Sequence, residues 1–254
     1  MITGCSQTGD TESSQAAKTK ADKTAEVTVT ETSAPVTTTF KKPEEYGKVI
    51  ALTFDDGPNT TATSMILDTL EKYGARASFF LIGDNINDES ARSVRRAVEL
   101  GCEINSHSRT HSYMDKMSAD DIIAEMEYTD EKIEAITGVT PRFFRPPYIA
   151  VSDTMYEVID KPFICGLGCD DWDDKVSAET ITESVLAQAE DGAIILLHDA
   201  KDNFRTPEAI ETIVPELQKQ GYELVTVSEL FYAKGVEPVE DNVLYSRALQ
   251  TGMY

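Results

Sequence analysis

The stretch Val49-Ile-Ala-Leu-Thr-Phe-Asp-Asp-Gly-Pro58 joins a continuous apolar run to a turn that carries two adjacent carboxylates. A run of consecutive apolar side chains is typical of a parallel strand that is buried on both faces. Asp, Gly and Pro, which follow it, are residues that favour tight turns. This stretch therefore predicts a central strand of a parallel sheet that ends in a polar turn.

Strands and helices alternate along the chain beyond this strand. Several expected helices end at a glycine, as at Gly74, Gly101 and Gly138. About seven βα units predict an α/β fold, a parallel sheet closed or nearly closed into a distorted (β/α)7–8 barrel. The expected strands cover residues 49–54, 77–82, 102–105, 142–145, 163–167, 193–197 and 223–227, and the expected helices cover residues 63–73, 90–100, 118–138, 153–159, 177–192, 206–221 (with a kink at Pro215) and 228–234.

Two segments of different composition flank this region. Residues 1–42 hold few large apolar side chains and predict a disordered linker. Ile2-Thr3-Gly4-Cys5 resembles the lipobox of bacterial lipoproteins, although a chance Gly-Cys pair is the alternative. The lipobox predicts an extracytoplasmic protein, either secreted or held at the cell surface by a lipid on Cys5. Residues 235–254 form a C-terminal extension to which the sequence assigns no role.

The charge of the chain limits its partners. The formal net charge is −22, and residues 6–42 are neutral, so the remaining residues carry the whole excess. Such a field repels nucleic acid and anionic lipid headgroups but tolerates neutral or cationic substrates. No apolar run approaches the roughly 20 residues that a membrane-spanning helix needs. We expect no nucleic-acid partner, membrane contact only through a lipid on Cys5, and a monomer.

Two of the three histidines, His107 and His111, lie in the polar run Ser-His-Ser-Arg-Thr-His-Ser over residues 106–112. A spacing of four residues puts both side chains on one face if the segment is helical. Two imidazoles and a carboxylate form the ligand set of a catalytic zinc-type site, and the two adjacent carboxylates after the first expected strand offer the third ligand. One divalent metal is expected, with zinc as the default, while cobalt, nickel or manganese would also fit.

Polar residues recur where the expected strands end. Because the carboxyl ends of parallel barrel strands form one rim, residues far apart in sequence meet there. This placement predicts a common site made from residues at or just past strand ends: Asp55, Asp56, His107, Arg145, Trp172 and His198.

Taken together, these runs resemble the polysaccharide deacetylases, the NodB-homology group that forms carbohydrate esterase family 4. Five family motifs are found in order between Thr53 and Asp199, and family-like sequence continues to about Leu230. The resemblance implies a distorted (β/α) barrel and a NodB-like catalytic domain over residues 43–234. It also implies that Asp55 is the general base and that Asp56, His107 and His111 bind the metal.

The third motif matches Arg145-Pro-Pro-Tyr148. By resemblance, Arg145 orients Asp55 through an ion pair, and the backbone N–H of Tyr148 helps to hold the oxyanion. The family usually has glycine next, whereas this chain has Ile149. Since a β-branched residue does not readily adopt positive φ, we expect the loop to run differently here and to narrow the substrate groove.

The fourth and fifth motifs match Asp171-Trp172 and Leu196-Leu-His198. By resemblance, Asp171 raises the pKa of His198, which protonates the leaving group, while Trp172 and Leu196 line the acetyl or sugar pocket. Gly168 stands where the family often has another aspartate. Gly168 and Ile149 depart from the family pattern, so a protein of the same fold without catalytic activity is an alternative.

The resulting hypothesis is an N-deacetylase of N-acetylglucosamine residues in an extracellular polymer such as peptidoglycan or a chitin-type oligomer. The same site could instead cleave O-acetyl esters on xylan, and a more distant alternative is hydrolysis of small cyclic amides. A non-catalytic carbohydrate-binding lipoprotein of the same fold is the alternative from another functional class.

Overall fold

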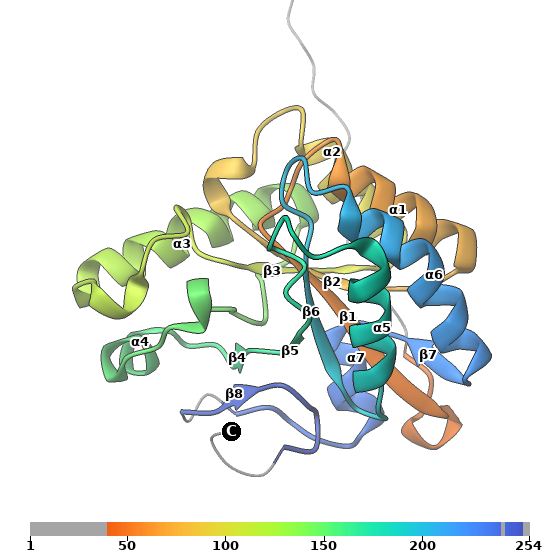
Figure 1. Ribbon diagram of the computed structural model, residues 1–254. Coiled ribbons are helices and arrows are strands. Elements are labelled where there is room, and N and C mark those ends of the chain that lie inside the picture. Colours follow the sequence, from red (N-terminus) through yellow and green to blue (C-terminus); the bar gives the residue numbers. More distant parts are fainter. Residues whose placement is uncertain (1–39, 240–241, 251–254) are drawn as a thin grey trace, which may run out of the picture. The chain divides into compact units, whose positions relative to one another are not determined.

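The computed structural model describes residues 40–239 and 242–250 (Figure 1). The expected lipobox and most of the expected linker lie outside the described residues. In the described part, the main sheet has the order β3-β2-β1-β6-β5, with β7 also paired to β1, and β4 and β8 form a second, two-stranded sheet. Every strand pair is parallel. The strands are β1 (Lys48–Asp55), β2 (Ser78–Leu81), β3 (Glu103–Ser106), β4 (Phe163–Ile164), β5 (Leu167–Gly168), β6 (Ile194–His198), β7 (Tyr222–Leu224) and β8 (Leu244–Tyr245).

Helices follow the strands, as the sequence predicts. In Figure 1, α1, α6 and α5 lie side by side along one side of the main sheet, and α6 packs against both neighbours. No helix in the described part of the chain is long and apolar enough to cross a membrane. The helices are α1 (Ala62–Tyr73), α2 (Ala91–Glu99), α3 (Ala119–Thr137), α4 (Asp153–Val158), α5 (Ala178–Gln188), α6 (Arg205–Lys219) and α7 (Val227–Ala233).

Strand β1 is buried on both faces, as the apolar run predicts. Ile50, Leu52 and Phe54 belong to the core cluster that also contains residues of α1 and α6. Val49 and Ala51 belong to a second cluster that contains residues of α7. Because side chains alternate along a strand, Asp55 at the end of β1 faces the same side as Val49 and Ala51. The alternation thus places the Asp55 carboxylate at the carboxyl end of β1, on the same face as Val49 and Ala51.

The wall of the barrel is discontinuous where the sequence predicts two ordinary strands. The expected strand over residues 142–145 is reduced to single bridges at Phe144, which connect it to β3 and to Phe163. Proline at positions 141, 146 and 147 removes the N–H donors that a longer ladder needs. The expected strand over residues 163–167 divides into β4 and β5 at Gly166, whose φ is 100°. The fold is therefore a barrel with a distorted wall, as expected.

The C-terminal extension contributes one strand to the second, two-stranded sheet. Strand β8 pairs in parallel with β4, and Leu244, Tyr245 and Ala248 are buried.

Helix α6 continues from Arg205 to Lys219 with Pro215 inside it. A proline cannot donate a hydrogen bond to the carbonyl four residues earlier in a helix. Here that carbonyl belongs to Glu211, which is exposed, so water can replace the lost donor.

Candidate functional site

The strand register brings the expected site together at the carboxyl end of β1. Asp55 lies in register with His198 at the end of β6 and with Phe80 in β2. Asp56 follows with a left-handed φ of 77°. His107 lies directly beyond β3, the strand that pairs with β2. Residues separated by up to 143 positions in sequence, namely 55 to 198, therefore meet on one rim.

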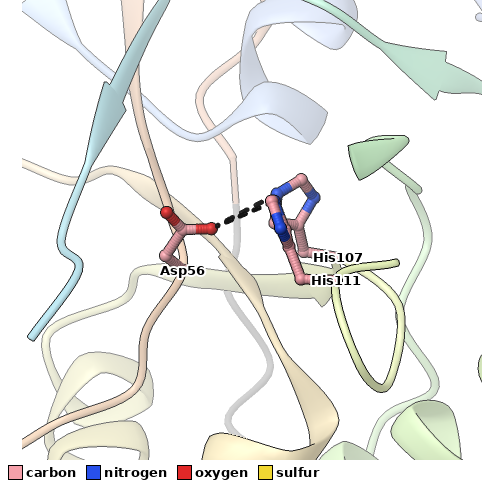
Figure 2. Close-up of side chains that lie close together, drawn as sticks. All are labelled: Asp56, His107 and His111. Atoms are coloured by element: carbon pink, nitrogen blue, oxygen red, sulfur yellow. Dashed lines mark ion pairs between the residues drawn. The ribbon is translucent and has the colours of Figure 1, made fainter. Parts of the chain in front are cut away.

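Asp56, His107 and His111 form a cluster that could hold a metal ion (Figure 2). Their three ligand atoms lie within 4.8 Å of one another. The Asp56 Oδ1 atom lies 3.6 Å from His107 Nε2 and 3.5 Å from His111 Nε2. This oxygen is buried and has no hydrogen-bond partner among the described residues. A buried carboxylate oxygen without a partner is unfavourable, and a divalent cation between the three ligands would satisfy it.

The two histidines are joined by a loop rather than by a helix. The four-residue spacing therefore does not bring their side chains together in the way expected for a helical segment. Ser108 and His111 both have left-handed backbone, with φ of 66° and 58°. The backbone N–H of His111 donates to the Ser108 hydroxyl at 3.0 Å. This bond closes the loop and turns the His111 ring back toward His107, with the ring centroids 4.9 Å apart.

His107 is prepared to act as a neutral ligand. Its Nδ1 lies 2.7 Å from the carbonyl oxygen of Arg145, an acceptor that requires Nδ1 to carry the proton. The lone pair of Nε2 is then directed toward Asp56, as in metal sites where the second ring nitrogen donates to a carbonyl. Burial lowers the pKa of His107 to about 3, despite the opposing charge of Asp56. The imidazole is therefore neutral at physiological pH and need not lose a proton to bind a cation.

Asp55 lies beside this cluster and is paired with Arg145. The Arg145 Nη1 atom donates to Asp55 Oδ1 at 2.5 Å, and Nη2 donates to the Thr53 hydroxyl at 2.8 Å. All three side chains are buried. Burial raises the pKa of Asp55, and the charge of Arg145 opposes that rise. The other oxygen, Asp55 Oδ2, lies 3.6 Å from His107 Nε2 and thus faces the metal cluster.

His198 is held by Asp171. The Nδ1 atom of His198 lies 2.8 Å from Asp171 Oδ1, and its backbone N–H donates to Asp171 Oδ2 at 2.7 Å. The Thr206 hydroxyl also donates to Asp171 Oδ2 at 2.6 Å. Burial lowers the pKa of His198, but the hydrogen bond and charge of Asp171 outweigh it and raise the pKa to about 9. His198 is therefore cationic at neutral pH and can donate a proton.

The loop after Arg145 differs from the sequence-based expectation. Ile149 was expected to avoid positive φ, yet Tyr148 and Ile149 have φ of 58° and 55°. Left-handed backbone at a non-glycine residue costs on the order of 1–3 kcal/mol. The hydrogen bond from Ile149 N–H to the Pro146 carbonyl and the packing of Ile149 against Met114 and its neighbours offset this cost. Ile149 therefore adopts the positive φ that its β-branched side chain disfavours, because tertiary packing overrides the local preference. The different loop path and the narrowed substrate groove stay predictions.

Tyr148 lies in the first turn of a short 3₁₀ helix, Pro147–Ile149, where backbone N–H groups lack partners within the helix. Its ring is 54% exposed and meets the edge of the His111 ring, with centroids 4.6 Å apart. On its other side it stacks on Tyr113 at 4.1 Å. The sequence reasoning missed Tyr113, which matches no motif and is half exposed beside the metal cluster.

Trp172 and Leu196 flank the same rim. Trp172 directly follows Asp171 and is 66% exposed, which is unusual for the only tryptophan of a chain. Leu196 in β6 is partly buried, and Gly166 approaches its Cβ closely.

Beside Asp56, a polar cavity of about 280 Å³ opens toward the loop after β2, and its lining includes Asn59, Asp84, Asn87, Glu89 and Lys201. The exposed Trp172 ring and this polar cavity suit a hydrophilic, ring-shaped ligand.

The chain is similar in sequence to known proteins. Residues 42–161 match the polysaccharide deacetylase family. A bifunctional xylanase/deacetylase of Pseudobutyrivibrio xylanivorans is 50% identical over 199 residues, which cover 78% of this chain and 33% of that protein. A peptidoglycan-N-acetylglucosamine deacetylase of Bacillus cereus is 37% identical over 198 residues, which cover 74% of this chain and 90% of that protein.

One similar solved structure contains a metal ion. A family 4 acetyl xylan esterase from Clostridium thermocellum, in complex with a cobalt ion, is 40% identical and superposes with a TM-score of 0.78. The match covers 80% of this chain and all of that chain. By contrast, the chain spans only 33–40% of the length of several curated relatives that it matches.

Proposed function

The chain belongs to the polysaccharide deacetylase family, and on that premise we propose that it removes acetyl groups from a polysaccharide by metal-assisted hydrolysis. One observation carries the proposal: a three-ligand cluster, a buried carboxylate–guanidinium pair and a carboxylate-held imidazolium occupy the same rim. These groups are Asp56 with His107 and His111, Asp55 with Arg145, and Asp171 with His198.

The attack on the acetyl group depends on Asp55 and Tyr148. A divalent cation at the three-ligand cluster would polarise the acetyl carbonyl and make a water molecule more acidic. Asp55, fixed by Arg145, accepts the proton that this water loses as it attacks the carbonyl carbon. The N–H of Tyr148 donates to the carbonyl oxygen as negative charge develops on it.

The departure of the sugar depends on His198. An amine or alkoxide leaving group needs a proton, and the imidazolium held by Asp171 supplies it. The same pair explains why the site suits amides, whose nitrogen is a poor leaving group unless it is protonated. N-acetylglucosamine residues of an extracellular polymer, of peptidoglycan or chitin type, are therefore the first candidate substrate. The similarity to the Bacillus cereus peptidoglycan deacetylase supports this choice.

Acetylated xylan is the second candidate substrate. The relative that is 50% identical is named a xylanase/deacetylase, and the solved structure that is 40% identical is an acetyl xylan esterase. Esters have a better leaving group than amides and depend less on His198. Zinc is the proposed metal because of its affinity for imidazole and carboxylate ligands, and cobalt is the alternative that the solved relative contains. Extracellular polymers of either kind would agree with the extracytoplasmic location that the Cys5 motif predicts.

The substrate is decided by measuring acetate release from chitopentaose, peptidoglycan and acetylxylan with added Zn²⁺, Co²⁺ or Mn²⁺. We expect release from at least one of the two amide substrates. Release from acetylxylan alone would establish the ester alternative. Glycan binding without any release at saturating metal would instead support a non-catalytic carbohydrate-binding protein.

Replacing His198 by Ala separates the two kinds of bond. We expect amide hydrolysis to fall by about 10²–10⁴-fold, the usual contribution of a general acid, while any ester hydrolysis falls much less. The ratio of the two rates in the variant and in the wild type is the measurement. Equal losses on both substrates would contradict the assignment of His198 as the acid.

The variant Asp171→Asn is expected to change the pH dependence of amide hydrolysis. Since Asp171 raises the pKa of His198 to about 9, the wild type keeps its acid protonated at neutral pH and loses activity only as the pH rises toward that value. Without the Asp171 carboxylate, only the charges of Asp55 and Asp56 still oppose the lowering of the His198 pKa by burial, so the loss should begin at lower pH. An unchanged basic limb of the kcat profile would count against this role.

A further inference from the structure

We propose that Asp199 is a positioning residue that fixes the turn carrying Asp55 and Asp56, and through this turn sets the affinity of the cluster for its metal. The proposal rests on the proposed function for its catalytic consequence but not for the metal affinity itself. Asp199 directly follows His198 and is fully buried. It is not one of the three residues of the metal cluster in the described part of the chain.

Asp199 bonds to both sides of the turn. Its backbone N–H donates to the carbonyl of Asp55 at 2.9 Å, which extends the β1–β6 ladder by one step. Its carboxylate accepts the N–H of Gly57 at 3.0 Å and the hydroxyl of Thr63 in the first turn of α1. Its carbonyl accepts the side-chain amide of Asn59 at 2.6 Å. A single residue thus ties down the turn directly before and directly after Asp56.

The carboxylate lies so close to Gly57 that any larger residue there would have to displace it. A Cβ built at Gly57 would lie 2.9 Å from Asp199 Cγ and would overlap both carboxylate oxygens. The φ of Gly57 is not in the left-handed region, so backbone freedom does not require glycine at this position. The close approach of Asp199 requires it.

This contact matters for the metal because Asp56 has a left-handed φ of 77°. Aspartate visits that conformation only at some cost, so the flanking residues must hold it. A buried carboxylate is itself expensive unless it is hydrogen-bonded, and the Gly57 N–H and the Thr63 hydroxyl each donate to one oxygen of Asp199. If the turn relaxed, Asp56 Oδ1 would leave its place 3.5–3.6 Å from the two imidazoles.

The variant Asp199→Ala is expected to weaken Zn²⁺ or Co²⁺ binding by about 10–100-fold, the usual effect of removing a group that supports a metal ligand. Asp199→Asn keeps an oxygen that can accept the Gly57 N–H, so most of the affinity should return. Calorimetric titration of the full chain with each metal provides the readout, which does not depend on catalysis. Wild-type affinity in folded Asp199→Ala would overturn the proposal; if that variant does not fold, Asp199→Ser takes its place.

A double-mutant cycle tests the contact itself. Gly57→Ala alone should weaken metal binding because the new methyl group displaces the Asp199 carboxylate. In the Asp199→Ala background the same change should have a much smaller effect, since the obstructing group is gone. Independent, additive effects of the two substitutions would overturn the proposal.

Asp191→Ala is the matched control. Asp191 accepts the N–H of Val49 at 2.8 Å at the opposite end of β1 and pairs with Lys234. Its loss should lower the Tm without changing the metal affinity of the folded protein. A drop in metal affinity as large as that of Asp199→Ala would show a general loss of stability and would overturn the proposal. Absence of acetate release by the wild type would refute only the proposed function.

Discussion

Replacing Asp55 by Asn is expected to lower kcat by about 10²–10⁴-fold, the contribution usual for a general base. The Asn side chain has nearly the same shape but cannot accept the proton of the attacking water. The metal cluster does not include Asp55, so the variant should still bind one divalent cation. Its stability should fall, because the buried guanidinium of Arg145 loses its carboxylate partner.

The measurement is kcat at saturating metal, together with the metal content of the folded variant, at a temperature well below its Tm. Asp160→Asn is the control, since it makes the same change of charge at an exposed residue. Full turnover in Asp55→Asn would refute the assignment of the base. A large loss in Asp160→Asn would show that net charge, rather than Asp55, governs the rate.

Replacing His107 by Ala is expected to reduce both metal binding and acetate release to background. His107 is buried and supplies one of three ligands, and its Nδ1 also connects the site to the Arg145 carbonyl. Wild-type protein treated with a chelator should lose activity and recover it when Zn²⁺, Co²⁺ or Mn²⁺ is returned. The variant should not recover with any of them.

The control for this variant is Asn87→Ala, which changes a residue that lines the polar cavity beside Asp56 but does not belong to the metal cluster. It should leave metal affinity unchanged. Metal binding of wild-type strength in folded His107→Ala would mean that the cluster is not the metal site. Metal-independent acetate release by the wild type would exclude the proposed role of the cation.

The elements that the sequence predicts best are those fixed by local chemistry. The apolar run of β1 predicts a strand buried on both faces because each of its side chains carries the same signal. Ser118 and Gly138 mark both ends of α3, where the serine side chain accepts the N–H of Asp121 and the glycine adopts φ of 73°. The placement of site residues at strand ends follows from the topology of parallel strands.

What the sequence does not predict depends on contacts distant in the chain. The backbone of His111 and Ile149 is left-handed because a hydroxyl, a carbonyl and a packed core hold it there. Strand β8 forms only because β4 has an edge to which it can pair. Tyr113 matches no motif, and Asp199 closes the stretch of motifs without a role that the sequence assigns to it. The contacts of both residues emerge only from the three-dimensional arrangement.

The most direct test of the central claim is anomalous diffraction from crystals of the protein grown with Zn²⁺ or Co²⁺. We predict one anomalous peak about 2.0–2.2 Å from a carboxylate oxygen of Asp56 and from one nitrogen of each of His107 and His111. Asp55 should face the ion while remaining paired with Arg145. A peak bound by other side chains, or none at saturating metal, would contradict the account.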